Sequence, residues 1–132
     1  MQECLFCKIV QGAVPSYKVY EDMNYLAFLD IFPRVTGHTL VIPKKHYRWV
    51  YDVPAFGEYW EVTRKVALTV QNVTGAAFTS FVTMGEEVAH AHIHIMPNIE
   101  KKPAGITFSP AVTISKEALF TLAEDIKKEI GR

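Results

Sequence analysis

From position 90 to position 95 the chain alternates between histidine and an apolar residue. An alternation of period two predicts a β-strand, because successive side chains of a strand leave opposite faces. The apolar set, Ala91, Ile93 and Ile95, then covers a core. The opposite face carries a row of imidazoles whose Cα atoms stand about 6.6 to 7 Å apart. The members of this row are His90, His92 and His94.

The rest of the chain divides into short apolar runs separated by glycine and proline. Runs of four to eight apolar residues bounded by turn residues are typical of strands, and longer three- and four-residue periodicity is typical of helices. The predicted strands are 18–21, 25–31, 38–42, 78–84 and 90–96, and the predicted helices are 4–11, 54–74 and 116–130. Residues 98–114 carry two prolines and a glycine, and they read mainly as a loop.

The links between the second and third strands and between the fourth and fifth strands are short. A parallel pair needs a crossover of a dozen or more residues, so these links favour antiparallel pairs. We therefore predict an α+β domain, a mainly antiparallel five-stranded sheet with helices packed on it.

The helix 54–74 has the clearest periodicity. Its apolar residues form one stripe, Asp52 is a plausible cap, Glu61 pairs with Lys65, and Gly75 is a natural stop. A stripe of this kind is more typical of a core or a dimer interface than of a cofactor site.

Composition limits the functions that the chain can have. Its 132 residues suit one domain, and 49% apolar residues suffice for a core. Lys+Arg and Asp+Glu number 14 each, which argues against a sequence-independent nucleic-acid binder. We see no signal peptide and no window near the ~20 apolar residues of a membrane span, so we expect a cytoplasmic protein without membrane contact.

The histidine row is a candidate reaction centre, because an imidazole can be nucleophile, acid, base or metal ligand near neutral pH. Cys4-x-x-Cys7 supplies half of a tetrahedral zinc site, and two histidines could complete it. Two packed or free thiols are the alternative reading of this pair.

Several blocks in order resemble the histidine triad (HIT) family of nucleotide hydrolases and transferases. The run from His90 to Met96 looks like the family's triad signature. The segments 4–9, 25–31 and 36–46 resemble its N-terminal segment, its ribose-binding strand and the strand and turn that follow. The match covers most of residues 4–97. We expect one HIT-like domain over 1–132, with 98–132 as a C-terminal loop and helix extension.

The resemblance implies a homodimer in which each subunit binds a purine nucleotide such as AMP over its sheet. It implies cleavage at the α-phosphate through a covalent intermediate on His92, with His94 as a hydrogen-bond donor to the phosphate. Asp30 would accept the ribose hydroxyls, although it could instead be an acid that caps the turn before Ile-Phe-Pro. The base would be walled by Leu5, Phe6, Ile9, Phe28 and Ile31, although each of these could equally be ordinary core.

Relatives that carry the cysteine pair complete the zinc site with the histidine of the Pro-Lys-Lys-His turn and with the first triad histidine. Here these residues are His46 and His90, so the predicted ligands are Cys4, Cys7, His46 and His90. The zinc would be structural, and His92 and His94 would remain for chemistry. We expect His38 to be a core residue or a supporting one.

The chain departs from the family pattern at three places. Glu86 stands where the family often has a glutamine that donates to phosphate, and an ionised carboxylate cannot donate. The backbone amide of Glu87 could still do so. The strand 78–84 lacks the usual asparagine, for which Ser80 or Thr83 could substitute, and no arginine follows the triad.

Three functions remain open at this stage. The first is a hydrolase or nucleotidyl transferase acting on phosphoramidates, dinucleoside polyphosphates or adenylylated metabolites. The second is a nucleotide-binding adaptor with little or no turnover, and the third is a metal-handling protein. Helix 54–74 with Trp49 and Tyr51 is the predicted dimer surface.

Overall fold

The structure is a computed structural model that describes residues 4–99 and 112–131. Three α-helices, five strands and one 3₁₀ turn are formed in these ranges. In chain order the elements are α1 (Leu5–Gln11), β1 (Tyr17–Glu21), β2 (Tyr25–Leu29), β3 (Thr39–Pro43), the 3₁₀ turn η1 (Val50–Asp52), α2 (Phe56–Thr74), β4 (Phe78–Val82), β5 (Ile93–Asn98) and α3 (Lys116–Ile130).

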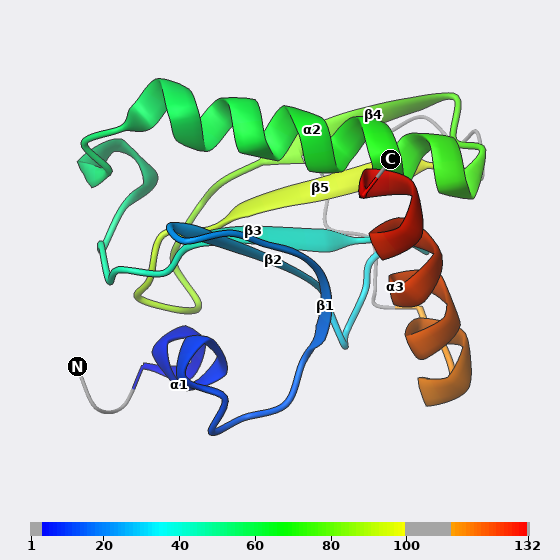
Figure 1. Cartoon of the computed structure of the whole chain (residues 1–132), viewed down its shortest axis with the longest axis horizontal. Helices are drawn as coiled ribbons and strands as arrows, with labels where there is room; N and C mark the ends of the chain where they lie inside the picture. The colour runs from blue at the N-terminus through cyan, green and yellow to red at the C-terminus, as the bar shows by residue number, and fades with distance from the viewer. Residues whose placement is uncertain (1–3, 100–111, 132) are drawn as a thin grey trace.

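The strands form one sheet in the order β1-β2-β3-β5-β4, and every neighbouring pair is antiparallel. β1, β2 and β3 follow one another directly, whereas α2 carries the chain across to the far edge (Figure 1). β4 is therefore an edge strand, and β5 returns between β4 and β3. The predicted α+β class with a five-stranded antiparallel sheet is confirmed.

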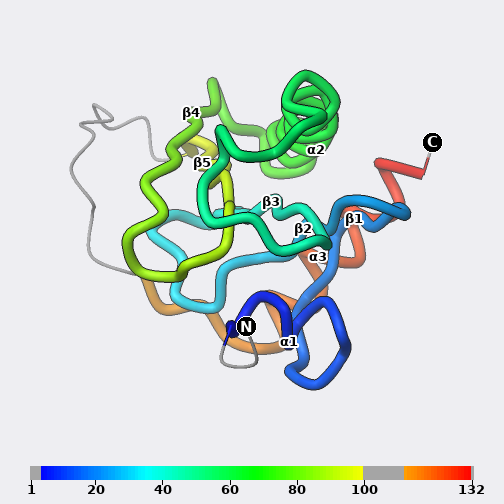
Figure 2. Tube along the Cα trace, turned by 90° about the vertical axis from the view of Figure 1, so that its left-hand side faces the viewer, coloured from blue at the N-terminus to red at the C-terminus, as the bar shows by residue number. Residues whose placement is uncertain are grey.

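The two faces of the sheet bury different cores. In β2, Tyr25 and Leu29 belong to the larger core with α2 and α3, whereas Leu26 and Phe28 belong to a smaller core with α1. Figure 2 shows α2 on one side of the strands and α1 on the other. Because β2 and β3 are buried along their whole length, these central strands are held from both faces.

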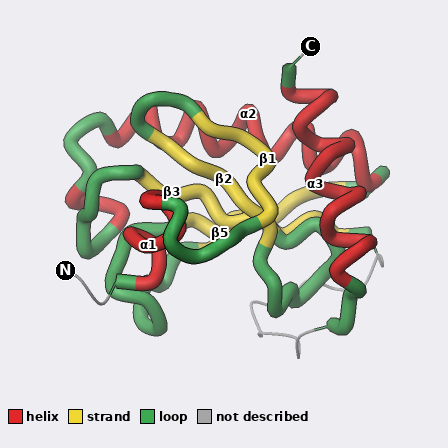
Figure 3. The backbone as a smooth tube through the Cα atoms, turned by 60° about the horizontal axis from the view of Figure 1, so that its bottom comes forward, coloured by secondary structure: helices red, strands yellow, loops and turns green. Residues whose placement is uncertain are grey.

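The third helix forms where the sequence predicted it. α3 spans Lys116–Ile130, and the Ser115 side chain caps it by accepting the backbone N–H of Ala118. Figure 3 shows α1 across one end of the sheet and α3 beside the opposite end. Most of the predicted loop 98–114 lies outside the described residues.

The start of α2 differs from the prediction. The helix begins at Phe56 rather than at 54, and its N-cap, Ala55, makes no side-chain hydrogen bond. The Asp52 carboxylate instead accepts the backbone N–H of Trp49 in the 3₁₀ turn. The predicted cap was wrong because the Asp52 carboxylate is hydrogen-bonded within the 3₁₀ turn that precedes the helix.

Two other details of α2 differ as well. The Glu61 carboxylate pairs with Arg64 at 2.9 Å and not with Lys65, whose amine lies over the Tyr20 ring. Phe56, at the start of the predicted buried stripe, is exposed. The remainder of the stripe is buried or half-buried, as predicted.

The strands are shorter or shifted relative to their predicted bounds. β2 ends at Leu29 and β4 at Val82, two residues earlier than expected in each case. β5 begins only at Ile93, so His90 and His92 precede it. The ladder with β3 reaches only Val41, and beyond it the backbone N–H of Ala91 donates to Tyr47 O instead.

Candidate active site and metal centre

His90, His92 and His94 share one side of the chain although only His94 lies in a strand. The rings of His92 and His94 are 4.9 Å apart, and the Phe6 ring of α1 contacts both His90 and His92. Ala91 is buried in the opposite core. The residues preceding β5 are thus extended enough to keep the predicted alternation, even without a sheet ladder.

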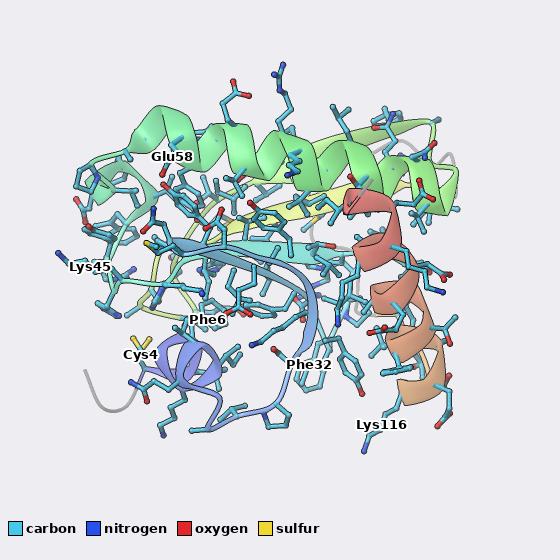
Figure 4. The ribbon with its side chains drawn as sticks, viewed as in Figure 1. Cys4, Phe6, Phe32, Lys45, Glu58 and Lys116 are labelled. Carbon is cyan, nitrogen blue, oxygen red and sulfur yellow. The ribbon has the colours of Figure 1, made fainter. Side chains whose placement is uncertain are left out.

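Cys4 and Cys7 lie at the start of α1 and face His46 and His90 (Figure 4, in which Cys4 is labelled). The Nδ1 atom of His90 is 3.3 Å from Cys4 Sγ and 3.5 Å from Cys7 Sγ. The Nδ1 atom of His46 is 3.3 Å from Cys7 Sγ. In a tetrahedral zinc site the Zn–S and Zn–N bond lengths place sulfur and nitrogen about 3.5 Å apart, so the four atoms fit such a site.

The protonation of His90 also suits a ligand. Its Nε2 lies 2.8 Å from the carbonyl oxygen of Pro43, which can only accept, so Nε2 carries the proton and Nδ1 keeps its lone pair. Burial lowers the pKa of His90 to about 4, which keeps the ring neutral. Burial and the neighbouring Cys4 raise the pKa of the Cys7 thiol to about 11, an effect that a bound cation would oppose.

In His92 the nitrogen without a proton is Nε2, whereas in His90 it is Nδ1. Its Nδ1 lies 2.7 Å from the carbonyl oxygen of His90, so the proton is on Nδ1 and the Nε2 lone pair is free. Burial is the main cause that lowers the pKa of His92. The hydroxyl of Thr83 donates to the carbonyl oxygen of His92 at 2.9 Å, which fixes the backbone on which the ring is mounted.

His38 and His94 form a directed chain of hydrogen bonds. The backbone N–H of Arg34 donates to His38 Nδ1 at 3.0 Å, so the proton of a neutral His38 is on Nε2. That Nε2 lies 2.8 Å from His94 Nδ1 and donates to it, which leaves the proton of His94 on its own Nε2. Burial, together with the neighbouring histidines and Arg34, lowers the pKa of His94 to about 3. His94 is therefore a neutral donor beside His92.

Asp30 lies next to this pair. One carboxylate oxygen accepts the backbone N–H of Phe32 at 2.8 Å, and the other, Oδ2, is 3.6 Å from His38 Nε2. The backbone N–H of Asp30 also donates to His38 O. His38 is buried, as predicted for a core or supporting residue, while the Asp30 side chain stays 20% exposed.

The predicted base-binding residues divide into two groups. Phe6, Ile9 and Phe28 belong together in the core under α1, and Figure 4 shows Phe6 pointing from that helix toward the sheet. Leu5 and Ile31 are instead 45% and 56% exposed. The predicted set is therefore divided between a buried core group and two exposed side chains.

The residues Gly85–Val88 before the triad are held by a residue that the sequence did not single out. The guanidinium of Arg48 stacks on the Trp49 ring at 3.7 Å and donates to Gly85 O at 2.7 Å. Glu86 and Glu87 are exposed. Arg48 and Gly85 are 37 residues apart, so no local pattern could have linked them. A cavity of about 210 Å³ is lined by residues 48–51, 83–85 and 91–92 and by the start of α2.

The sequence model of the HIT domain matches residues 11–101. The chain belongs to the HIT family. The fold agrees with that of a solved hypothetical histidine triad nucleotide-binding protein from Sulfolobus tokodaii, at a TM-score of 0.86, 32% identity, and coverage of 97% of this chain and 92% of the other.

Two further relatives of this HIT domain are informative. Adenosine 5'-monophosphoramidase HNT1 of Saccharomyces cerevisiae is 30% identical over 126 residues, which are 93% of this chain and 80% of the yeast protein. A zinc-bound histidine triad protein from Mycobacterium smegmatis is similar at a TM-score of 0.80 and 27% identity, covering 98% and 94% of the two chains.

Within residues 4–99 and 112–131, no helix is both long and apolar enough to cross a membrane.

Proposed function

We propose that this HIT domain cleaves purine nucleotide derivatives at the α-phosphate through a covalent nucleotidyl intermediate on His92. The free Nε2 lone pair of His92 carries the proposal, because a neutral imidazole nitrogen is a competent nucleophile near pH 7. The likeness to a yeast AMP phosphoramidase supports the same reaction class. Phosphoramidates, dinucleoside polyphosphates and adenylylated metabolites are the candidate substrates.

In the first step the Nε2 lone pair of His92 attacks phosphorus while the bond from phosphorus to the leaving group breaks. The leaving group departs with that electron pair, and an amine leaving group takes a proton from water. The imidazole becomes cationic, and the His90 carbonyl stabilises it by accepting its Nδ1–H. The Nε2–H of His94 donates to a phosphoryl oxygen as negative charge gathers there.

In the second step a water oxygen attacks the same phosphorus. The P–N bond breaks, its electron pair returns to His92 Nε2, and AMP is released while the water proton goes to solvent. Asp30 would accept the ribose hydroxyls, and the backbone amide of Glu87 would give a further donor to the phosphate. Cys4, Cys7, His46 and His90 would hold a zinc ion whose chemistry is structural, tying α1 to the segment before β5.

The test compares wild-type protein with His92→Asn, using adenosine 5'-phosphoramidate and chromatographic detection of AMP. We expect turnover to fall by on the order of 10³-fold or more, because the nucleophile is lost. The wild-type protein, quenched in acid-free medium, should carry a mass increase of one AMP unit that His92→Asn lacks. Unchanged turnover in the variant would exclude His92 as the nucleophile. Asp125→Asn on α3 is the control for a substitution remote from the site.

A nucleotide-binding adaptor is the second candidate, and Glu86 favours it. This exposed carboxylate stands where the family often has a donor to the phosphate, and its charge opposes an anionic ligand. Calorimetry with AMP distinguishes the two functions. Tight binding of AMP together with no hydrolysis of the phosphoramidate would favour the adaptor.

The proposal includes a homodimer built on α2 and the edge strand β4. The rings of Phe56, Trp60 and Phe81 form a continuous edge-to-face series, and Phe56 and Phe81 remain exposed. Of the predicted surface aromatics, Tyr51 is 73% exposed while Trp49 is half-buried. Sedimentation at low concentration should give a dimer that Phe81→Glu dissociates, since aromatic anchors carry much of an interface. A monomeric wild-type protein would refute the dimer.

A further inference from the structure

Three side chains from neighbouring strands stand in a row across the sheet. Asp30 follows β2, His38 precedes β3, and His94 lies in β5, which pairs with β3. The ligand atoms of these three side chains all lie within 4.8 Å of one another. The row begins at a partly exposed carboxylate, passes through a buried imidazole, and ends at the half-buried imidazole beside His92.

The middle member of the row has one proton and two acceptors. His38 Nδ1 accepts from the Arg34 backbone, so the only proton of neutral His38 is on Nε2. That proton is donated to His94 Nδ1 at 2.8 Å, while Asp30 Oδ2 lies 3.6 Å from the same Nε2 atom. The closer nitrogen receives the hydrogen bond, and the more distant carboxylate competes for it through its full negative charge.

Backbone contacts hold Asp30 and His38 near each other. Asp30 N–H donates to His38 O, and the Asp30 carboxylate is anchored by the N–H of Phe32. Gly37, at φ +88°, packs against Pro97 so closely that an added Cβ would lie 3.0 Å from it. These contacts hold the backbone that carries the carboxylate and the imidazole in one arrangement.

We propose that Asp30 couples occupation of the ribose site to the donor strength of His94, with His38 as the positioning residue between them. This inference rests on the proposed function for the identity of the ligand. Two ribose hydroxyls that donate to Asp30 occupy its lone pairs and disperse its charge. The carboxylate then attracts the His38 Nε2 proton less, and the hydrogen bond from His38 Nε2 to His94 Nδ1 becomes stronger. Hydrogen bonds in a chain polarise one another, so the Nε2–H of His94 becomes a better donor to the phosphoryl oxygens.

A ribose site that only binds the substrate and a ribose site that is coupled to His94 predict different kinetic results. Interactions that hold ground state and transition state equally change KM alone, whereas coupling to His94 changes kcat. The substrates for the test are adenosine 5'-phosphoramidate and its 2',3'-dideoxy counterpart, each at saturating concentration. We expect kcat of the wild-type protein to fall at least about fivefold with the dideoxy substrate, the lower range of coupling between sites.

Asp30→Asn is the matched variant, because asparagine keeps an oxygen for the Phe32 N–H but removes the charge. In this variant the kcat values for the two substrates should become equal within about twofold. Asp125→Asn, which removes an exposed carboxylate from α3, should keep the wild-type ratio. Equal kcat values for the two substrates in the wild-type protein, with only KM changed, would overturn the coupling.

A second measurement does not depend on turnover. Imidazole ¹⁵N spectra report which ring nitrogen carries a proton and how strongly it is hydrogen-bonded. Saturating AMP should shift the signals of His38 Nε2 and His94 Nδ1, and saturating 2',3'-dideoxy-AMP should shift them by less than half as much. Equal shifts with both nucleotides would refute the coupling. If neither phosphoramidate is hydrolysed, the proposed function fails, and these spectra still decide the coupling.

Discussion

Two clusters of this small domain each contain a pair of histidines, and they differ in the direction of their lone pairs. At the start of α1, the Nδ1 atoms of His46 and His90 both point at cysteine sulfurs. Across the sheet, His38 Nε2 points at His94 Nδ1, as donor to acceptor, at 2.8 Å. The first arrangement brings four candidate ligand atoms close together, and the second is a hydrogen bond from one imidazole to the next.

The cluster at the start of α1 suits a metal ion better than the cluster across the sheet. Convergent lone pairs are what a cation needs, and the observed S···N distances match a tetrahedral site. A proton already lies between His38 and His94, because the Arg34 amide occupies the remaining nitrogen of His38. Residue types alone would not have excluded a metal at the second cluster, since Asp30, His38 and His94 are also residue types that bind metals.

The largest expected effect is at the first cluster. In Cys4→Ser/Cys7→Ser, zinc content should fall from about one ion per chain to less than a tenth, as two of four ligands are lost. Loss of a structural zinc ion removes several kcal/mol of folding free energy, so the melting temperature should fall by about 10 °C or more. Elemental analysis and thermal unfolding measure the two quantities.

His38→Asn is the control for this experiment and should keep its zinc. Wild-type protein without tightly bound zinc would contradict the metal assignment. Two tightly bound ions per chain would instead remove the distinction between the clusters and favour a metal-handling protein.

The second effect concerns catalysis at the other cluster. In His94→Gln, kcat for adenosine 5'-phosphoramidate should fall by about 10²- to 10³-fold, the usual loss when one preorganised donor is removed. Its zinc content should remain unchanged, because His94 is not among the residues that face the cysteines. Steady-state kinetics with elemental analysis of the same sample tests both statements. A variant that loses zinc together with activity would show that the two clusters are not independent.

A smaller effect is expected at the turn that carries Asp30 and His38. Gly37→Ala places a Cβ in a left-handed conformation and 3.0 Å from Pro97 Cγ, so we expect a loss of about 1–3 kcal/mol in unfolding free energy. Gly57→Ala is the matched control, because nothing lies within 4 Å of its added Cβ. Urea unfolding measures both variants, and equal stability of the two would contradict this prediction.

The smallest effect is a dependence of stability on pH. Burial lowers the pKa values of His38 and His94, that of His94 to about 3, while the unfolded imidazoles titrate near 6.5. Between these values the unfolded chain binds more protons, so unfolding free energy decreases as pH falls below 6.5. For half-buried His94 we expect about 1 kcal/mol between pH 7 and pH 5 after allowance for solvent screening. Urea unfolding of His94→Gln at both pH values should show a correspondingly smaller decrease.

Much of the fold could be predicted from local pattern. Helix 116–130 was predicted at its observed bounds, because Ser115 caps it and its apolar face is periodic. The short links predicted antiparallel strands, which the sheet confirms. The cap of α2 was missed because the neighbouring 3₁₀ turn engages the Asp52 carboxylate, and the start of β5 was missed because the Ala91 N–H donates to Tyr47 O in a distant segment.

The family, the order of strands and helices and the types of side chain at the candidate site could be predicted from the sequence, because these depend on residue identity and spacing along the chain. The proton positions in His38, His90, His92 and His94 follow from contacts that exist only in the folded chain. These positions depend on carbonyls and amides brought from other strands and turns, such as Pro43 O at His90 and the Arg34 N–H at His38. The same contacts separate a set of candidate metal ligands from a chain of hydrogen-bond donors.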